Sequence, residues 1–386
     1  MIPHFRRFAI TICSFLFAFL TKKNADPPRR KEILRRLRSL RLVFSRKNEY
    51  NGGNMNFHER GGWMPARDNS VASYAQQILT QVKTVVVGKD PVLLWVLAAI
   101  LARGHILLED IPGVGKTTMA LAFSRVLSLS CSRVQFTPDL LPADIIGTLI
   151  YSQKTETFVV KRGPVFANFI LADEINRAPA KVQSALLEAM QERQVTIGGE
   201  TFPLPEPFLV LATENPIEQE GTYNLPEAQT DRFMMKVIID YPTLEEEKAI
   251  VRAKLDEKKP EEVRPVVGAN KIMHAREVVK DIYIDEKIEQ YIADIVFATR
   301  YPERYKLKDM KDYISFGGSP RASINLAYAS RAYAFLKRRG YVIPEDVRAV
   351  AHDVLRHRIG LSYEAEAANV TSDNIIDEII NKVAVP

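Results

Sequence analysis

The sequence predicts an α/β domain built on a parallel sheet over residues 55–242, followed by a smaller all-helical domain over residues 243–386. Three observations lead to this fold. Apolar strand-like runs alternate with helical patterns from Ser70 onward, as in parallel α/β sheets. After Tyr241 the strand-like runs give way to charged amphipathic helices. A chain of 386 residues is also long enough for one large and one small domain.

Composition is that of an ordinary globular protein, with 46% hydrophobic and 26% charged residues. The formal net charge of +6 is unevenly distributed, because residues 1–54 hold 13 Lys or Arg against 3 Asp or Glu. Residues 55–386 hold 40 basic and 44 acidic residues, so they give no composition-level sign of a duplex-binding face. Cys13 and Cys131 do not form a spaced pair typical of zinc sites or secreted domains, which favours a reducing, cytoplasmic compartment.

The basic leader, residues 1–54, allows three interpretations. Arg6 and Arg7 precede the apolar run Phe8–Leu20, as in a cleaved signal peptide. The 13 residues of that run extend about 20 Å as a helix, short of the roughly 30 Å hydrocarbon core, so a peripheral membrane anchor is a second interpretation. We favour the third, a mis-assigned start with translation beginning at Met55, because two glycine codons just upstream can spell a bacterial ribosome-binding site.

The first elements of the α/β domain lead to a loop suited to phosphate. Ser70–Val86 has helical apolar spacing, and a second helix is expected over Pro91–Ala102, with Asp90 as its cap. The loop follows a predicted strand, His105–Leu108, and precedes a predicted helix, Met119–Leu127.

Within the loop, backbone N–H groups and the positive end of the helix can hold phosphates. Lys116 would reach the β and γ oxygens, and Thr117 would supply a hydroxyl to Mg²⁺. The strict phosphate-loop pattern asks for glycine where this chain has Asp110, so an ordinary strand-to-helix turn is the alternative. The expected nucleotide-binding residues are Pro112, Gly113, Val114, Gly115, Lys116, Thr117 and Thr118.

Two carboxylates and an asparagine follow later apolar strands. Asp173 and Glu174 end the run Phe169–Ala172, which places them at the carboxyl edge of a buried sheet, where ligands bind in open α/β folds. Asp173 is expected to hold Mg²⁺ with Thr117, and Glu174 to accept a proton from the water attacking the γ-phosphate. Asn215 would contact the γ-phosphate or orient that water. The alternatives are helix-capping acids and a turn-forming asparagine.

Six stretches of the chain carry a more specific signal: Gln135–Pro142, Gly163–Asn168, Asp173–Pro179, Ser184–Glu192, Asn215–Thr222 and Leu225–Gln229. In this order they resemble the AAA+ superfamily, and specifically its MoxR family. The resemblance runs from about Val71 to the C-terminus and does not cover the leader. The family's loop does not depend on a glycine at the position of Asp110.

The resemblance implies roles for individual residues. Lys116 and Thr117 match Walker A, Asp173 and Glu174 match Walker B, and Asn215 matches the first sensor.

Two arginines complete the set that the resemblance implies. Arg321 matches the second sensor, and Arg232 looks like the arginine finger that a neighbouring subunit inserts. For Arg232 the alternative is an ion pair with Asp231 or Glu227, while Arg177 is the competing trans-acting cation.

Beyond the site, residues 148–161 and 195–202 are predicted to form two hairpins, which resemble insertions that project towards a ring pore or partner. The C-terminal helices Asp285–Arg300, Pro320–Arg338 and Pro344–Arg356 are expected to pack as a lid over the nucleotide, bringing Arg321 to the phosphates.

The resemblance implies an ATPase that hydrolyses ATP with Mg²⁺ at the subunit interfaces of a homo-oligomeric ring, expected to be a hexamer. It further implies a chaperone that remodels or matures partner proteins containing von Willebrand factor A domains. A nucleic-acid motor is the first alternative, although the chain lacks a basic or aromatic-rich stretch that would grip a strand. A nucleotide-gated scaffold with little turnover is the second.

Overall fold

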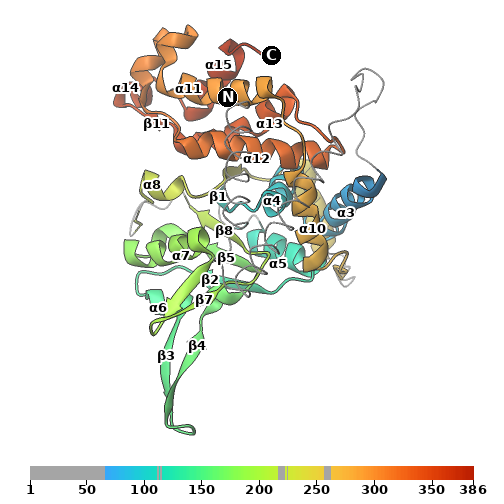
Figure 1. Ribbon diagram of the computed structural model, residues 1–386, viewed down its shortest axis with the longest axis vertical. Coiled ribbons are helices and arrows are strands. Elements are labelled where there is room, and N and C mark those ends of the chain that lie inside the picture. Colours follow the sequence, from blue (N-terminus) through green and yellow to red (C-terminus); the bar gives the residue numbers. More distant parts are fainter. Residues whose placement is uncertain (1–65, 111–112, 114, 216–221, 224, 256–261) are drawn as a thin grey trace, which may run out of the picture. The chain divides into compact units, whose positions relative to one another are not determined.

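The computed structural model describes residues 66–110, 113, 115–215, 222–223, 225–255 and 262–386 (Figure 1). The expectations for the leader, Pro112 and Val114 therefore concern residues outside the described part. Among the described residues, no helix has the length and apolar character needed to cross a membrane.

A five-stranded parallel sheet forms the centre of the α/β domain, in the order β2-β5-β8-β1-β9. Its strands are β1 (Ile106–Asp110), β2 (Cys131–Gln135), β5 (Phe169–Asp173), β8 (Leu209–Glu214) and β9 (Met235–Ile239). The parallel sheet predicted from the alternating pattern is thus confirmed. The chain leaves β1 towards one side of the sheet and returns to the other side as β9. This reversal in strand order is where ligands bind in open α/β folds.

Helices cover both faces of this sheet, which is why its central strands β5 and β8 are almost entirely buried. One face contacts α4 (Asp90–Ala102) and α5 (Lys116–Val126), with α3 (Ala66–Val82) packed against them, while α7 (Ala180–Glu192) and α6 (Pro142–Ile146) belong to the opposite side. Side chains alternate between the two cores: Ile106 and Leu108 of β1 face the α4 side, and Leu107 faces the α7 side.

The predicted first helices are present with shifted ends. The helix expected over 70–86 runs from Ala66 to Val82. Asp90 is the first residue of α4 rather than its cap; Lys89 occupies the cap position in a left-handed conformation, and Asp90 forms an ion pair with Lys83 at 2.6 Å. Lys83 directly follows α3, so this exposed ion pair joins the end of α3 to the start of α4.

Both predicted hairpins are confirmed. The first pairs β3 (Gly147–Ser152) with β4 (Thr157–Arg162), and the second pairs β6 (Gln194–Ile197) with β7 (Glu200–Pro203). Gly198 and Gly199 turn the second hairpin with φ values of 61° and 88°, a conformation that favours glycine. The β3–β4 hairpin extends away from the sheet on the side opposite the C-terminal helices (Figure 1).

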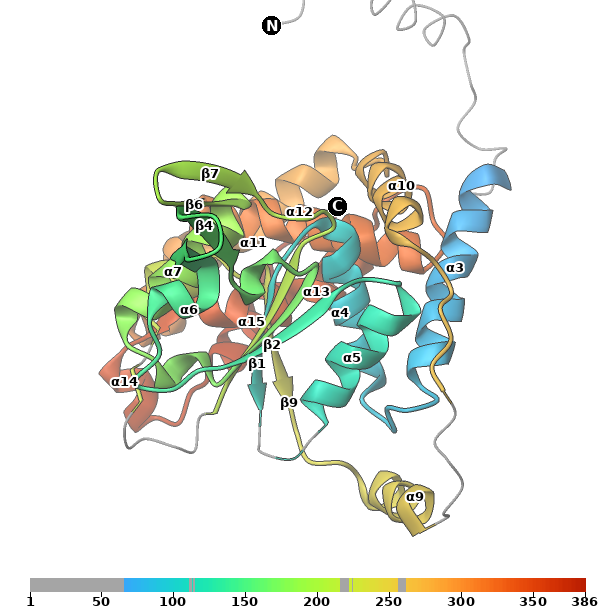
Figure 2. The same ribbon diagram turned by 90° about the horizontal axis from the view of Figure 1, so that it is seen from below.

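The C-terminal part is predominantly helical. Its principal helices are α9 (Leu244–Leu255), α10 (Ala269–Lys280), α11 (Glu286–Arg300), α12 (Pro320–Leu336), α13 (Pro344–Leu355), α14 (Tyr363–Ala367) and α15 (Ser372–Lys382). The expectation of an all-helical domain needs one correction, because β10 (Ile314–Phe316) and β11 (Gly360–Leu361) form a short antiparallel ribbon. Figure 2 shows α9 standing apart from the sheet beyond the end of β9.

The lid, as we call residues 269–386, shares its apolar core with the α/β domain. Leu326 of α12 and Val350 of α13 belong to the same buried cluster as Leu97 of α4. Contacts of α12 with α4 and of α13 with β9 fix where the lid rests. It packs on the α4 side of the sheet, and this position decides which residues of the lid can approach which edge of the sheet.

Candidate active site

Two described residues of the segment after β1, Gly113 and Gly115, have a backbone conformation that suits a phosphate loop. Gly113 and Gly115 adopt φ values of 88° and 84°, and a Cβ placed on either one would meet no atom within 4 Å. These glycines are therefore required by conformation, and they leave open space beside the backbone. Gly115 occupies the cap position of α5 without any side-chain cap, so the first N–H groups of that helix are available to an anion.

Asp173, at the end of β5, is the buried carboxylate of the site. Its carboxylate lies 3.7 Å from Lys116 Nζ and accepts hydrogen bonds from Arg133 Nη2 at 2.7 Å and Thr213 Oγ1 at 2.9 Å. Burial alone would raise the pKa of Asp173, but the hydrogen bonds from Arg133 and Thr213 and the charge of Lys116 outweigh burial and lower the pKa below its usual value. Asp173 therefore carries a negative charge at neutral pH.

Glu174 follows directly in a left-handed conformation, with φ of 57°, which is uncommon for a residue other than glycine. Its N–H donates to Thr213 Oγ1 at 2.8 Å, which helps to hold this turn. Two donors reach its carboxylate: Gln135 Nε2 at 2.9 Å and Arg177 Nε at 2.9 Å. Backbone strain of this kind recurs at functional sites, where the surrounding structure holds it in place.

Arg177, the competitor for the trans-acting role, is thus engaged by Glu174 within its own subunit. Asn215 lies buried immediately after β8, the strand between β5 and β1. Its position follows from strand order: β8 lies between β5, which ends at Asp173, and β1, which precedes Gly113 and Gly115.

These residues fit a nucleotide with its magnesium ion. The glycine cradle and the uncapped N-terminus of α5 suit phosphate oxygens, and Lys116 lies at the same edge of the sheet. Asp173 and Thr117 supply a carboxylate and a hydroxyl, the hard oxygen ligands that Mg²⁺ prefers. Of the expected site residues, Lys116, Thr117, Asp173, Glu174 and Asn215 therefore lie at one edge, the carboxyl edge of the sheet.

Arg232 and Arg321 lie elsewhere. Arg232 precedes β9, and Met234 N donates to the carbonyl of His105 at 2.8 Å, so this segment borders the amino edge of the sheet. Arg321 lines the same cavity as Arg232 and His105, with a volume of about 190 Å³. One β1 strand of five residues, about 16 Å at 3.3 Å per residue, separates this edge from the phosphate loop.

Within one subunit, the lid therefore does not bring Arg321 to the phosphate loop in this conformation, and its approach to the phosphates of a neighbouring subunit stays a prediction. Packing of α12 against α4 and of α13 against β9 holds the lid where Arg321 faces the amino edge. The suggested ion pair of Arg232 with Asp231 is also absent from the ion pairs of the described residues, because Asp231 pairs with Arg321 and Arg358 instead.

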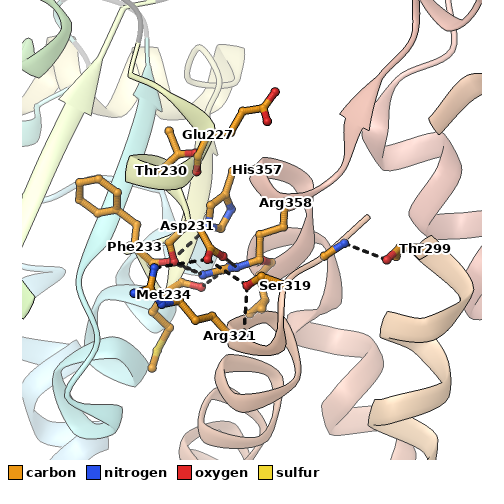
Figure 3. Close-up of polar contacts among 12 residues, drawn as sticks. Glu227, Thr230, Asp231, Phe233, Met234, Thr299, Ser319, Arg321, His357 and Arg358 are labelled. Atoms are coloured by element: carbon orange, nitrogen blue, oxygen red, sulfur yellow. Dashed lines mark hydrogen bonds and ion pairs between the residues drawn. The ribbon is translucent and has the colours of Figure 1, made fainter. Parts of the chain in front are cut away.

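Figure 3 shows this second cluster, in which Asp231 joins the α/β domain to the lid. Arg358 Nε donates to Asp231 Oδ1 at 2.8 Å, Ser319 Oγ donates to Asp231 Oδ2 at 2.9 Å, and Arg321 Nη1 lies 3.4 Å from Oδ2. Ser319 also caps α12 by accepting from the N–H of Arg321 at 3.1 Å. Asp231 therefore lies at the positive end of a lid helix, where a carboxylate is stabilised.

The geometry agrees with what the chain is similar to. Residues 105–235 match the model of the ATPase family associated with various cellular activities, and residues 308–379 match the AAA lid domain. Chaperone MoxR1 of Mycobacterium tuberculosis is 47% identical over 312 residues, which cover 81% of this chain and 82% of that protein. The chain belongs to the MoxR family of AAA+ ATPases.

Two further proteins that are similar to this chain agree with the assignment to this family. Protein MoxR of Paracoccus denitrificans is 33% identical over 295 residues, or 72% of this chain and 86% of that protein. The crystal structure of a candidate ATPase from Cytophaga hutchinsonii matches with a TM-score of 0.79 and 48% identity, covering 83% of this chain and 97% of that one. The fold predicted from sequence, a parallel α/β core followed by a helical lid, is thus that of the family.

Sequence reasoning missed several residues of this MoxR-type site. Arg133 and Gln135, on β2, contact Asp173 and Glu174 across neighbouring strands, and Arg358 reaches Asp231 from the lid. Gln135 begins one of the six stretches that resemble the MoxR family. That resemblance is the one signal in the sequence that points to Gln135. Nothing in the sequence pairs Arg358 with a position 127 residues earlier.

Proposed function

We propose that this MoxR-type chain hydrolyses ATP at the interfaces of a homo-oligomeric ring, expected to be hexameric, and uses the energy to remodel partner proteins. The observation that carries the proposal is the separation of two half-sites. The phosphate loop and Walker B carboxylates lie at the carboxyl edge of the sheet, and Arg232 and Arg321 lie at the amino edge. One subunit therefore offers one complete half-site to each of two neighbours.

At the carboxyl edge, Lys116 would bind the β- and γ-phosphates, together with the backbone N–H groups of the glycine loop. Thr117 and Asp173 would hold Mg²⁺, which when bound neutralises phosphate charge. Asn215 would orient the attacking water, and Glu174 would accept its proton. Gln135 Nε2 and Arg177 Nε both contact Oε2 of Glu174, so they orient the carboxylate that would serve as the base.

At the amino edge, Arg232 would act in trans as the arginine finger. Arg321 would join it, in trans as well, because a side chain that is 47% exposed beside Arg232 cannot reach its own phosphate loop across the sheet. Cations supplied from a neighbouring subunit stabilise the charge that spreads over the γ-phosphate oxygens in the transition state. Arg177 is bound to Glu174 of its own subunit, so we favour Arg232 over Arg177 as the trans-acting cation.

The partner is proposed to be a protein that contains a von Willebrand factor A domain, as the family resemblance implies. The β3–β4 hairpin is the part of the described chain best suited to reach a partner. It exposes Tyr151, Phe158 and Ile150, with Phe158 70% exposed. Aromatic residues of this kind are common at protein interfaces.

Mixed rings test the trans arrangement. Arg232→Ala should bind ATP almost normally and hydrolyse it more slowly by a factor on the order of 10³, because the finger acts on the transition state. Mixing it with Glu174→Gln subunits creates interfaces where an intact Glu174 meets an intact Arg232, so steady-state hydrolysis should partly return. Rings that demonstrably mix and stay inactive would place Arg232 in its own subunit.

Steady-state hydrolysis measured with a von Willebrand factor A-domain protein, with single-stranded DNA and with neither distinguishes the three functions. The proposal expects stimulation by the protein alone. Stimulation by DNA alone would favour a nucleic-acid motor, and negligible turnover under all three conditions would favour a nucleotide-gated scaffold.

A further inference from the structure

Arg358 is a buried cation whose hydrogen bonds surround the proposed finger. It belongs to the short 3-10 helix η5 (Arg356–Arg358) of the lid and is only 3% exposed. Besides its ion pair with Asp231, its Nη2 donates to the carbonyls of Asp231 at 3.0 Å and Phe233 at 2.5 Å. Its Nη1 donates to the carbonyls of Met234 at 3.2 Å and of Val354.

Three of the carbonyls that Arg358 contacts lie on both sides of Arg232 in the chain. Asp231 comes immediately before Arg232, and Phe233 and Met234 come immediately after it. This segment connects the four-residue helix α8 (Glu227–Thr230) to β9, so little regular secondary structure of its own holds it. The N–H of Arg232 donates to the carbonyl of Gln229 at 3.2 Å, while its buried Nε has no hydrogen-bond partner among the described residues, so contacts of the flanking residues add to the few that hold this segment.

We propose that Arg358 is the positioning residue of the arginine finger, fixing the backbone on both sides of Arg232 so that its side chain meets the nucleotide of the neighbouring subunit. This inference rests on the proposed function, in which Arg232 acts in trans. The planar guanidinium is suited to the task, because its donors form a rigid fork that contacts several carbonyls at once. Figure 3 shows the fork reaching this segment from the lid.

The same contacts connect the finger to the lid. Asp231 binds Arg358 from η5 and Ser319 and Arg321 from α12, so three lid residues meet the α/β domain through one carboxylate. Burial lowers the pKa of Arg358 to about 10, offset in part by the charge of Asp231, so the guanidinium stays protonated at neutral pH. A movement of the lid would therefore be transmitted to Arg232 through Asp231 and Arg358.

Arg356 provides a matched control two residues away. It is also a largely buried lid arginine, with its side chain 11% exposed, and it forms ion pairs with Asp353 and Asp373. Its contact with the α/β domain is to the carbonyl of Lys236, inside β9 rather than beside the finger. Loss of Arg356 therefore removes a buried lid cation and leaves the contacts of residues 231–234 intact.

The test compares full-length Arg358→Met, Arg358→Lys and Arg356→Met rings, each checked for folding by circular dichroism and for assembly by size-exclusion chromatography. Arg358→Met should bind ATP with near wild-type affinity and hydrolyse it about 10²-fold more slowly, the scale of loss expected when a catalytic group is misplaced by about 1 Å. Arg358→Lys keeps the charge and loses the fork, so it should fold and remain impaired. Arg356→Met should keep hydrolysis close to wild type.

Mixing with Glu174→Gln subunits gives the decisive readout. Since Arg358 acts through the finger on a neighbour's site, the Arg358→Met subunit keeps a competent Glu174, and hydrolysis should partly return in mixed rings. Wild-type rates in Arg358→Met and Arg358→Lys would overturn the inference. The inference would also be overturned if a slow Arg358 variant were not rescued in mixed rings while Arg232→Ala was rescued. If Arg358→Met fails to fold, Arg358→Lys serves as the variant in this comparison. Failure of the Arg232→Ala mixture itself would instead count against the proposed trans function.

Discussion

The two edges of the parallel sheet hold functional residues of different origin. At the carboxyl edge, Lys116, Asp173 and Asn215 each follow closely on a strand, and the sheet brings them together because its strands are parallel neighbours. At the amino edge, Asp231 meets Arg321 and Arg358 only because the lid folds back onto the α/β domain. The first edge is organised by local sequence and strand order, whereas the second depends on how two parts of the chain pack.

The charge balance of the two edges also differs. At the carboxyl edge, Glu109 and Glu214 hold Lys236 between them at 2.6 and 2.7 Å. Burial would lower the pKa of Lys236, but these two carboxylates raise it above its usual value. At the amino edge, Arg232, Arg276 and Arg331 line one cavity of about 470 Å³. The arginines that line this cavity suit a neighbour's phosphates, as the proposed function requires.

The largest effects are expected at the carboxyl edge and separate binding from chemistry. Lys116→Ala should abolish ATP binding, because the phosphates lose their principal cation. Glu174→Gln should retain binding and reduce hydrolysis on the order of 10²- to 10⁴-fold, because an amide cannot accept the water's proton. Equilibrium binding of a fluorescent nucleotide and steady-state phosphate release measure the two quantities. Near wild-type hydrolysis by Glu174→Gln would remove the catalytic assignment from this edge.

A smaller effect on hydrolysis is expected at the amino edge, where it tests the role of Arg321. Arg321→Ala should reduce hydrolysis by about tenfold to 100-fold, the scale of one lost hydrogen bond to a charged group, with little change in nucleotide affinity. Rate measurements on mixtures with Glu174→Gln rings decide where the residue acts. Partial recovery is expected if Arg321 serves the neighbour. An unrescued loss would mean that the lid leaves the amino edge during turnover and serves its own nucleotide.

The smallest effect concerns pH and the stability of the amino edge. Burial and the nearby Arg193 lower the pKa of His105 to about 3, against an ordinary value of 6.5. Below pH 6.5, His105 therefore binds a proton in the unfolded chain, whereas in the folded chain it stays neutral until about pH 3. The contribution of neutral His105 to the free energy of unfolding is therefore complete above pH 6.5. It is lost as the pH falls from 6.5 to about 3.

Replacing the histidine checks this sign. Urea unfolding between pH 6.5 and 4 should show a free energy of unfolding that falls less steeply in His105→Gln than in wild type, by up to about 1.4 kcal/mol per pH unit. The exposed His274 provides the control, and His274→Gln should retain the wild-type slope. Identical slopes in His105→Gln and wild type would show that His105 is not neutral in the folded protein.

Much of the fold was predictable because each element had a local cause. Phe169–Ala172 is a continuous apolar run and becomes a central strand, and the glycine pair 198–199 turns the predicted hairpin. Element ends were less predictable, as Asp90 illustrates, since it is the first residue of α4 and pairs with Lys83, while Lys89 takes the cap position.

The sequence by itself determined the carboxyl edge: Lys116, Asp173 and Asn215 lie there because parallel strands must end on the same side of a sheet. Only the tertiary structure decided that Arg232 and Arg321 lie at the other edge and that Arg358 contacts the carbonyls on both sides of Arg232. The physical reason is that α12 and α13 bury apolar side chains against α4 and β9, in a core shared with the α/β domain. Such packing between distant segments depends on complementary surfaces in three dimensions, which no local pattern in the sequence records.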